Sequence, residues 1–218
     1  MKVPLSRKRV ARIFLVIVSV SLFILVGEYA RSNDISTSDL IIFRSLNGLS
    51  GNSSVDTIFL VVTELGTPLV WLAITVLASI FFKGRRVRVL VLLGAALIGA
   101  ELLEAFLKPI YHRERPFTSL DGVTTVGGMA SGFSFPSGHA LRSFAGSMVL
   151  LRFRKSIAYV LLAVSGLVAL SRIYLGLHYP SDVLASFLLA YLLAELVIFA
   201  QRAHISRDSG KGLSVAPS

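Results

Sequence analysis

Three short clusters of polar residues interrupt a chain of 218 residues that is otherwise strongly apolar. They contain cations, histidines, a carboxylate and a glycine turn, the groups needed to hold a phosphate and cleave its ester bond. Polar groups are costly near a membrane and tend to mark function there. In chain order the clusters are residues 108–116, from Lys108 to Arg115-Pro116, then Pro136-Ser137-Gly138-His139, then Ser171-Arg172 followed by His178 and Asp182.

The third cluster places a histidine and a carboxylate at a spacing that suits a nucleophile. His178 and Asp182 are four residues apart, with Pro180 between them at an expected helix start. Asp182 can accept the proton on one ring nitrogen and leave a lone pair on the other. A histidine oriented in this way can act as a nucleophile, whereas a lone histidine near a membrane surface is more often an interface residue. The paired carboxylate favours the catalytic interpretation.

The second cluster is typical of a helix start that binds an anion. Proline suits the first helical turn, and Gly138 lets a ligand approach the backbone closely. The free N–H groups of that turn form an anion site, to which the hydroxyl of Ser137 can add a donor. An ordinary helix cap at a membrane interface has the same composition, so this tetrapeptide alone leaves both interpretations open.

Three cations, Lys108, Arg115 and Arg172, are candidate phosphate ligands. Arginine offers a planar fork that matches two phosphate oxygens, and lysine offers a compact point charge. Each cation alone could instead be a side chain that reaches from an apolar helix to the membrane interface. Three of them beside two histidines favour a phosphate site.

Long apolar blocks must position these clusters. Hydrophobic residues make up 54% of the chain, and its mean hydropathy is +0.75. Several blocks approach the roughly 20 residues that a spanning helix requires, so the sequence predicts an all-α integral membrane bundle of six transmembrane helices. The blocks at 67 and 140 are short and are expected to extend into flanking polar residues. The blocks are residues 10–26, 67–82, 89–107, 140–151, 157–170 and 183–200.

Residues 1–205 are expected to form a single domain, followed by a disordered tail at 206–218. Within the polar segment 31–54, apolar residues at helical spacing indicate a short amphipathic helix on the outer surface. Residues 55–65 are expected to form a separate short helix before the break at Gly66-Thr67-Pro68. The first apolar block could be a signal peptide, but the residues after it lack the small residue three positions before a cleavage point.

The placement of basic residues indicates the orientation of the bundle. The net charge is +10, and with six spans 15 of the 22 lysines and arginines fall on the side of the two termini. That side is predicted to be cytoplasmic, in a bacterial inner membrane, which puts all three polar clusters at the outer ends of helices. Nucleic-acid binding is not favoured, because the charges flank apolar helices and form no single face. The absence of cysteine excludes thiol nucleophiles and cysteine metal sites.

The three clusters together resemble the three motifs of the type 2 phosphatidic acid phosphatase (PAP2) superfamily. That pattern is Lys, six residues and Arg-Pro, then Pro-Ser-Gly-His, then Ser-Arg, five residues, His, three residues and Asp. Every fixed letter is present here in the family's order and internal spacing, between Lys108 and Asp182. The six-span layout extends the resemblance to nearly the whole chain.

This resemblance implies a mechanism. It implies that His178 attacks phosphorus and forms a phosphohistidine, that Asp182 orients it, and that His139 protonates the leaving group and then activates water. It requires no metal and no cofactor, because the cations supply the charge that magnesium supplies elsewhere. The groups that it implies for binding the phosphoryl oxygens are Lys108, Arg115, Ser137, Gly138 and Arg172.

Arg142 lies one turn beyond His139, inside an expected span. A charge at such a position is costly and is expected to be paired. Glu101 and Glu104 are the nearest partners for a structural ion pair, and contact of Arg142 with a lipid headgroup is the alternative. The spacer residues of the first cluster, His112, Arg113 and Glu114, are interpreted as loop.

The sequence therefore predicts a membrane lipid phosphatase that acts on a phosphate monoester or diphosphate of a lipid in the bilayer. Candidate substrates are undecaprenyl diphosphate, phosphatidylglycerol phosphate, phosphatidic acid and a lipid A phosphate, because the motifs contact only the phosphoryl group. The alternatives are a lipid phosphotransferase with the same site and a non-enzymatic lipid transporter or binder. A transporter would carry charges at mid-membrane, whereas these lie at helix ends. The oligomeric state is not predicted.

Overall fold

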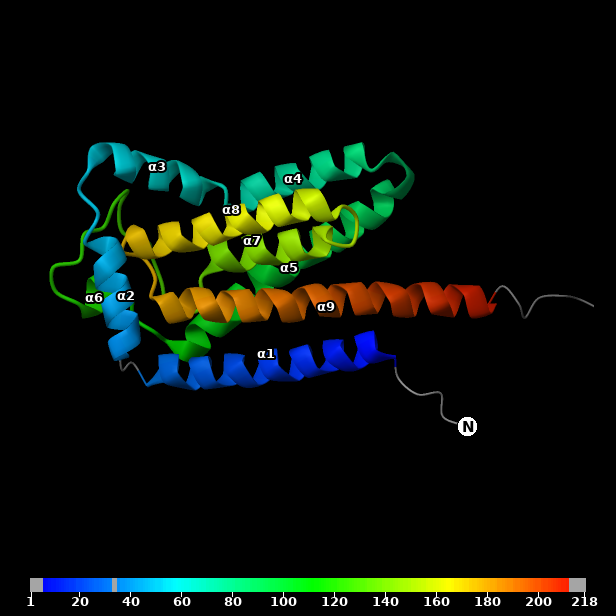
Figure 1. Cartoon of the computed structure of the whole chain (residues 1–218), viewed down its shortest axis with the longest axis horizontal. Helices are drawn as coiled ribbons and strands as arrows, with labels where there is room; N and C mark the ends of the chain where they lie inside the picture. The colour runs from blue at the N-terminus through cyan, green and yellow to red at the C-terminus, as the bar shows by residue number, and fades with distance from the viewer. Residues whose placement is uncertain (1–5, 33–34, 212–218) are drawn as a thin grey trace, which may run out of the picture.

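The computed structural model describes residues 6–32 and 35–211, and over these residues the chain folds into helices and loops without a β-strand (Figure 1). The all-α class expected from the apolar blocks is therefore confirmed. The last helix continues to Lys211, and residues 212–218 of the expected tail lie outside the described residues. The helices are α1 (Arg7–Arg31), α2 (Thr37–Asn47), α3 (Ser53–Glu64), α4 (Pro68–Phe81), the 3₁₀ turn η1 (Lys83–Arg85), α5 (Arg86–Tyr111), α6 (Pro116–Ser119), α7 (Gly138–Leu150), α8 (Lys155–Tyr174) and α9 (Pro180–Lys211).

Four helices of the described chain, α1, α5, α8 and α9, are long and apolar enough to cross a membrane. The pair α3 and α4 makes a fifth if it is counted as one span bent by 55°. The remaining expected span is α7, which has only 13 residues. Eleven of these residues are buried, so α7 is surrounded by other helices rather than by lipid. The six expected blocks are all helical, but one of them is a short central helix.

Two short helices were expected before α4, the first of them on the outer surface, and the structure places α2 across one end of the bundle (Figure 1). Ser36 begins α2 by accepting a hydrogen bond from the backbone N–H of Asp39 at 2.9 Å. Asn52 begins α3 in the same manner. These caps satisfy N–H groups that a helix start leaves without partners. Pro68 occupies the first turn of α4, where its missing N–H costs nothing, so the chain turns between α3 and α4.

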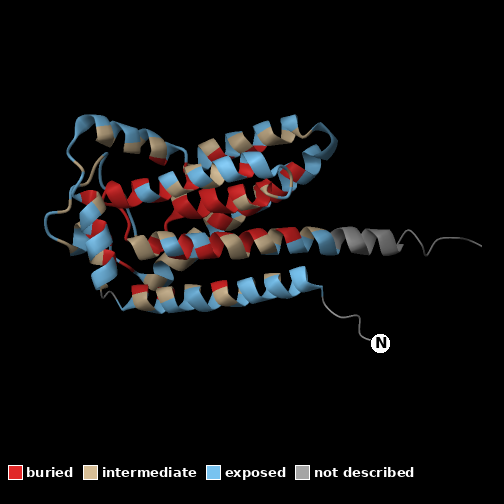
Figure 2. Cartoon of the chain, viewed as in Figure 1, coloured by how far each residue is buried: buried red, intermediate tan, exposed pale blue. Residues whose placement is uncertain are grey.

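Helix α7 lies at the centre and packs against α5, α8 and α9. Figure 2 shows buried residues concentrated on α7 and on the facing sides of α8 and α9, whereas α1 and α4 expose most of their surface. Small residues such as Ala100, Ala140 and Ala190 lie where α5, α7 and α9 meet, and they let these helices approach closely. The exposed apolar side chains of the outer helices form the surface that a lipid bilayer would cover.

The start of α1 and the end of α9 lie at one end of the bundle, together with the α4–α5 and α7–α8 connections (Figure 1). Helices α2 and α6 lie at the opposite end, together with the connection between α8 and α9. Because the ends of α5, α7, α8 and α9 that carry the polar clusters meet there, residues from the three clusters become neighbours.

Candidate active site

His178 lies in the connection between α8 and α9, in a completely buried setting. Its side chain is 2% exposed, and that of Asp182 is 0% exposed. The His178 Nδ1 atom lies 3.4 Å from Asp182 Oδ2, which is within ion-pair range and longer than a strong hydrogen bond. Asp182 Oδ2 is fixed by the backbone N–H of Tyr179 at 2.9 Å. The histidine and the carboxylate are therefore neighbours in space, although Nδ1 makes no hydrogen bond within the described residues.

The other ring nitrogen of His178 faces Arg115. Arg115 Nη1 lies 3.3 Å from His178 Nε2. A guanidinium has only donors, so this contact needs the lone pair of Nε2 and places the ring proton on Nδ1, toward Asp182. The backbone carbonyls of Leu177 and Gly132 hold Arg115, each accepting a hydrogen bond at 2.9 Å. The resulting tautomer has its nucleophilic nitrogen directed at a cation.

Burial, together with the positive charges of Arg115, Arg172 and Lys108, lowers the pKa of His178 well below its ordinary value of 6.5. Removing an imidazolium from water is unfavourable, and neighbouring cations add repulsion. The ring is therefore neutral near pH 7, which is the state in which a histidine is nucleophilic.

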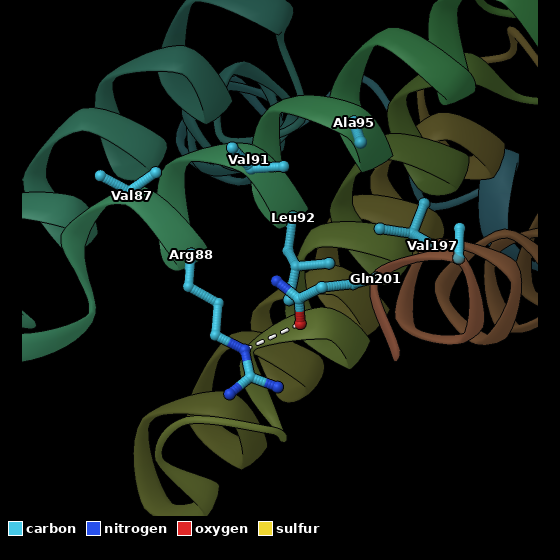
Figure 3. A pocket seen from close by; sticks show the side chains of 8 residues that line it. Val87, Arg88, Val91, Leu92, Ala95, Val197 and Gln201 are labelled. Atoms are coloured by element: carbon cyan, nitrogen blue, oxygen red, sulfur yellow. Dashed lines mark hydrogen bonds between the residues drawn. The ribbon is translucent and has the colours of Figure 1, made fainter. Parts of the chain in front are cut away.

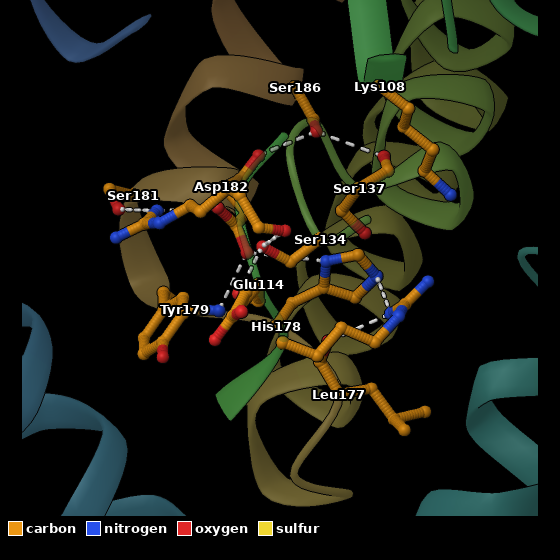
Figure 4. A network of polar contacts seen from close by, with 12 residues as sticks. Lys108, Glu114, Ser134, Ser137, Leu177, His178, Tyr179, Ser181, Asp182 and Ser186 are labelled. Carbon is orange, nitrogen blue, oxygen red and sulfur yellow. Dashed lines mark hydrogen bonds and ion pairs between the residues drawn. The ribbon is translucent and has the colours of Figure 1, made fainter. Parts of the chain in front are cut away.

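The start of α7 contributes Ser137, Gly138 and His139. The backbone N–H of Ser137 lies 3.5 Å from the carbonyl oxygen of Asp182, and the hydroxyl of Ser186 donates to the carbonyl oxygens of both residues (Figure 4). These bonds join the second cluster to the third. The Ser137 hydroxyl is buried and has no hydrogen-bond partner among the described residues. An unsatisfied buried hydroxyl is costly, and a phosphoryl oxygen would satisfy it.

His139 is half-buried and lies near His178. The charges of Arg172, Arg142 and Lys108 all act on it. The ring packs against the backbone of Gly66 at the break between α3 and α4, where an added Cβ atom would lie 3.0 Å from the Cβ of His139. The two histidines thus come from different helix ends and face the same site.

The remaining cations, Arg172, Lys108 and Arg142, are each held by neighbouring side chains. Arg172 donates from Nη1 to the hydroxyl of Thr63 at 2.8 Å, and its buried Nε has no partner among the described residues. Lys108 Nζ lies 2.6 Å from Glu104 Oε1. Arg142 is paired with Glu101 and, at 3.2 Å, with Glu104, which are the partners expected for it. The site is therefore a cluster of cations around two histidines.

Arg113 was interpreted as a loop spacer, and the structure shows a different role. Its side chain is 2% exposed and forms ion pairs with Asp182 Oδ1 at 2.6 Å and with Asp39 Oδ2 at 2.8 Å. The guanidinium also lies 4.2 Å above the ring of Tyr179. Asp39 belongs to α2, so an arginine of the first cluster joins this surface helix to the carboxylate behind His178.

Two further contacts were not found from the sequence. Thr63 binds Arg172, and the carbonyl oxygen of Gly66 accepts a hydrogen bond from Arg142 at 3.3 Å. Both residues flank the break between α3 and α4. The Gly66-Thr67-Pro68 break was recognised as an end of a helix, but nothing in its pattern indicates that it reaches the polar clusters.

A large groove lies elsewhere, between α5 and α9 (Figure 3). It is lined almost entirely by apolar side chains, and Arg88 Nε donates to Gln201 at 2.8 Å beside it. It contains no residue of the three clusters. Size alone therefore does not locate the chemistry of this protein, because the groove offers no nucleophile and no cluster of charges.

Comparison with known proteins identifies the family of this chain. The family model described as PAP2 superfamily matches residues 89–205. Undecaprenyl-diphosphatase BcrC of Bacillus subtilis is 33% identical over 157 residues, which cover 71% of this chain and 80% of the relative. An undecaprenyl-diphosphatase of Sulfolobus acidocaldarius is 26% identical over 84% of this chain and 85% of its own.

Solved structures share the arrangement of helices. The crystal structure of a transmembrane PAP2-type phosphatidylglycerolphosphate phosphatase from Bacillus subtilis has a TM-score of 0.67 and 25% identity, and the match covers 85% of this chain and 96% of that chain. The crystal structure of LpxE from Aquifex aeolicus has a TM-score of 0.65 and 26% identity, over 73% of this chain and 93% of that chain. The chain is therefore a multi-pass membrane protein that belongs to the PAP2 superfamily, among its phosphatases.

Proposed function

We propose that this protein hydrolyses the phosphate ester or diphosphate of a membrane lipid through a phosphohistidine on His178. The observation that carries the proposal is the setting of that ring, with Arg115 at 3.3 Å from Nε2 and Asp182 at 3.4 Å from Nδ1. A phosphoryl group held by Arg115 lies next to the lone pair that would attack it. Positioning and charge stabilisation are the main requirements of phosphoryl transfer.

In the first step, the lone pair of His178 Nε2 attacks phosphorus and the bond to the leaving oxygen breaks. His139, which lies near His178, gives that oxygen a proton. In the second step, His139 takes a proton from water, the water oxygen attacks phosphorus, and the P–N bond breaks to release inorganic phosphate. Asp182 holds the Nδ1 proton throughout and stabilises the charge that develops on the ring.

The phosphoryl oxygens are bound by the cations and by the start of α7. Arg115 and Arg172 provide guanidinium donors, Lys108 provides a point charge, and Ser137 and Gly138 provide a hydroxyl and backbone N–H groups. The buried hydroxyl of Ser137 and the buried Nε of Arg172 support this assignment, because both lack partners among the described residues. Together these groups offset the negative charge of the transition state without a metal ion.

Undecaprenyl diphosphate is the first substrate to test. Two relatives that match more than two thirds of this chain are undecaprenyl-diphosphatases. The exposed apolar faces of the outer helices are suited to a substrate with a long hydrocarbon tail. Phosphatidylglycerol phosphate, lipid A phosphates and phosphatidic acid are the next candidates, because the cradle contacts the phosphoryl group that they share.

The proposed setting is a bacterial cytoplasmic membrane, with both termini in the cytoplasm and the site at the outer face. The basic residues of the α4–α5 and α7–α8 connections support this orientation, since positive charge is enriched in cytoplasmic loops. The enzyme would therefore act on lipid phosphates of the outer leaflet. Residues 1–205 would supply the whole site as one domain.

The test is phosphate release by the purified full-length protein from a panel of these four lipids. Inorganic phosphate is expected from at least one of them, with and without EDTA, and none is expected from a folded His178→Ala protein. A loss of activity in EDTA that magnesium restores would contradict the metal-free mechanism. Transfer of phosphate to an alcohol without release of inorganic phosphate would identify a phosphotransferase. If none of the four lipids is hydrolysed, the alternative of a non-enzymatic lipid binder is favoured.

A further inference from the structure

The carboxylate of Glu104 lies inside the proposed phosphate cradle. Its Oε1 atom is 2.6 Å from Lys108 Nζ, and its Oε2 atom is 3.2 Å from Arg142 Nη2. A Cβ atom added to Gly138 would overlap this carboxylate. The carboxylate therefore packs directly on the backbone of the glycine that begins α7, where the N–H groups of the helix start are expected to receive a phosphoryl oxygen.

Glu104 also acts on the cations to which it is not directly bonded. Its negative charge stabilises the charged forms of Arg115 and Arg172. One carboxylate thus contacts Lys108 and acts through its charge on Arg115 and Arg172. Cations this close repel one another when they are partly buried, so Glu104 stabilises the resting cradle by balancing their charge.

A phosphoryl group and this carboxylate compete for the same place. Both are anions with oxygen acceptors, and both would use Lys108 and the region of Gly138. Two negative groups cannot share such a site without repulsion. Binding of the substrate therefore requires Glu104 to leave.

The structure provides a way for Glu104 to leave. Its side chain is 19% exposed and lies on α5 one turn before Lys108, so rotation of the side chain can carry the carboxylate out of the cradle. Arg142 does not lose its charge balance, because Glu101 is also paired with it. The Glu101 side chain is 43% exposed and has no recorded contact with Lys108 or Gly138.

We infer that Glu104 is a resident competitor of the phosphoryl group, which occupies the cradle at rest, gives way to the lipid phosphate and returns to expel inorganic phosphate. This inference rests on the proposed function, since it uses the same cradle. It makes Glu104 a residue that tunes the affinity of the site for phosphate, rather than one that touches the reacting atoms.

The test is the affinity for inorganic phosphate of the Glu104→Gln protein. The amide keeps the size of the side chain and removes its charge. If the cradle is free of the carboxylate about one tenth of the time, the substitution is expected to lower the inhibition constant of phosphate by about tenfold. The KM for the lipid should fall with it, and kcat should not rise. Glu101→Gln is the matched control and is expected to change either constant by less than about twofold.

A purely positioning role for Glu104 predicts weaker, not tighter, binding of phosphate in the Glu104→Gln protein. If the carboxylate only positions Lys108 and Arg142, Glu104→Gln would weaken phosphate binding, and the inference would be wrong. Calorimetric titration of phosphate into the purified proteins measures this without turnover, so it remains decisive even if none of the tested lipids is a substrate. Thermal unfolding in detergent checks that both variants are folded.

Discussion

The pKa of His178 depends on charges that come from different segments of the chain. Arg115 comes from the loop between α5 and α6, and Arg172 from the end of α8, and both lower the pKa of the same ring. The negative charge of Asp182, beside Nδ1, acts against these positive charges. The ring is therefore neutral in the resting protein, while a full charge on it is stabilised only as phosphorus is attacked. This difference between the two states is what a catalytic site must provide.

This setting predicts an unusual dependence on pH. Protonation of His178 removes the nucleophile, and a pKa well below 6.5 delays that loss until the pH has fallen far below 6.5. Replacing Arg115 by Gln removes the largest charge effect on the ring, so the acid limb of kcat/KM should move to higher pH in Arg115→Gln. The second ionisation of a phosphate monoester lies near pH 6 and is common to both enzymes. Profiles that coincide after normalisation would contradict this account.

The residues proposed to carry the chemistry could be identified from the sequence, because their types and spacing indicate that chemistry. Lys108, His139 and His178 are examples, and their convergence follows from the helix ends. Arg113 could not be found in this way, since its neighbours in the first cluster are loop residues and its partner Asp39 lies 74 positions earlier. Glu104 was identified only as a partner for Arg142, because its contact with Gly138 exists only in the folded chain.

Helix α2 is joined to the site by a chain of charges. Asp39 accepts from Arg113 and from the backbone N–H of Ser181 at 2.9 Å, and Arg113 in turn holds Asp182. The sequence indicated a surface helix from its apolar spacing, but Asp39 resembles any acidic residue in a first helical turn. The structure shows that this helix supports Asp182, the carboxylate beside the proposed nucleophile His178.

Replacing Asp39 by Asn tests this connection. The substitution removes one of the two charges that hold Arg113, so Asp182 should be less well fixed. We expect kcat to fall by about tenfold with little change in KM, in line with the roughly 1.5–3 kcal/mol of a hydrogen bond to a charged group. Steady-state phosphate release measures both constants.

Asp56→Asn is the control for the previous substitution. Asp56 lies on α3 and accepts from the hydroxyl of Tyr174 at 2.6 Å, but it has no recorded contact with Arg113 or Asp182. The kcat of the Asp56→Asn protein should equal that of the unaltered protein. If Asp39→Asn lowers the temperature of unfolding while kcat stays unchanged, α2 contributes to the fold and not to the chemistry.

The central helix α7 depends on a close contact with α4. A Cβ atom added to Gly146 would overlap the ring of Trp71, which is 4% exposed and donates from Nε1 to Ser143 at 3.2 Å. Because the ring is buried and bonded, Gly146→Ala should destabilise the protein by about 1–3 kcal/mol through overpacking.

Gly166→Ala is the same substitution in the neighbouring helix α8, where an added Cβ meets nothing within 4 Å. Its expected effect is a gain of up to about 1 kcal/mol, from helix propensity alone. Thermal unfolding in detergent compares the two proteins. Equal shifts of the two would contradict the close contact between α4 and α7.

At the scale of the whole molecule, the lengths of the apolar blocks predicted most of the helical architecture. The blocks that became α1, α5, α8 and α9 are long enough to identify a span without further information. The length of α7 could not be predicted, because a helix that is buried by other helices does not have to match the bilayer. The bend of 55° between α3 and α4 is also a property of packing, although its proline was visible.

The orientation of the bundle can be tested because the natural chain contains no cysteine. Gly84, in the basic α4–α5 connection, has open space around it, and Met129, in the loop before α7, is 77% exposed. Single cysteines at these positions lie at opposite ends of the bundle. A membrane-impermeant maleimide added to intact spheroplasts should label Met129→Cys and should label Gly84→Cys only after the membrane is opened. The reverse labelling pattern would place the site at the cytoplasmic face. The enzyme would then reach lipid phosphates of the inner leaflet, because it acts on the leaflet that its polar clusters face.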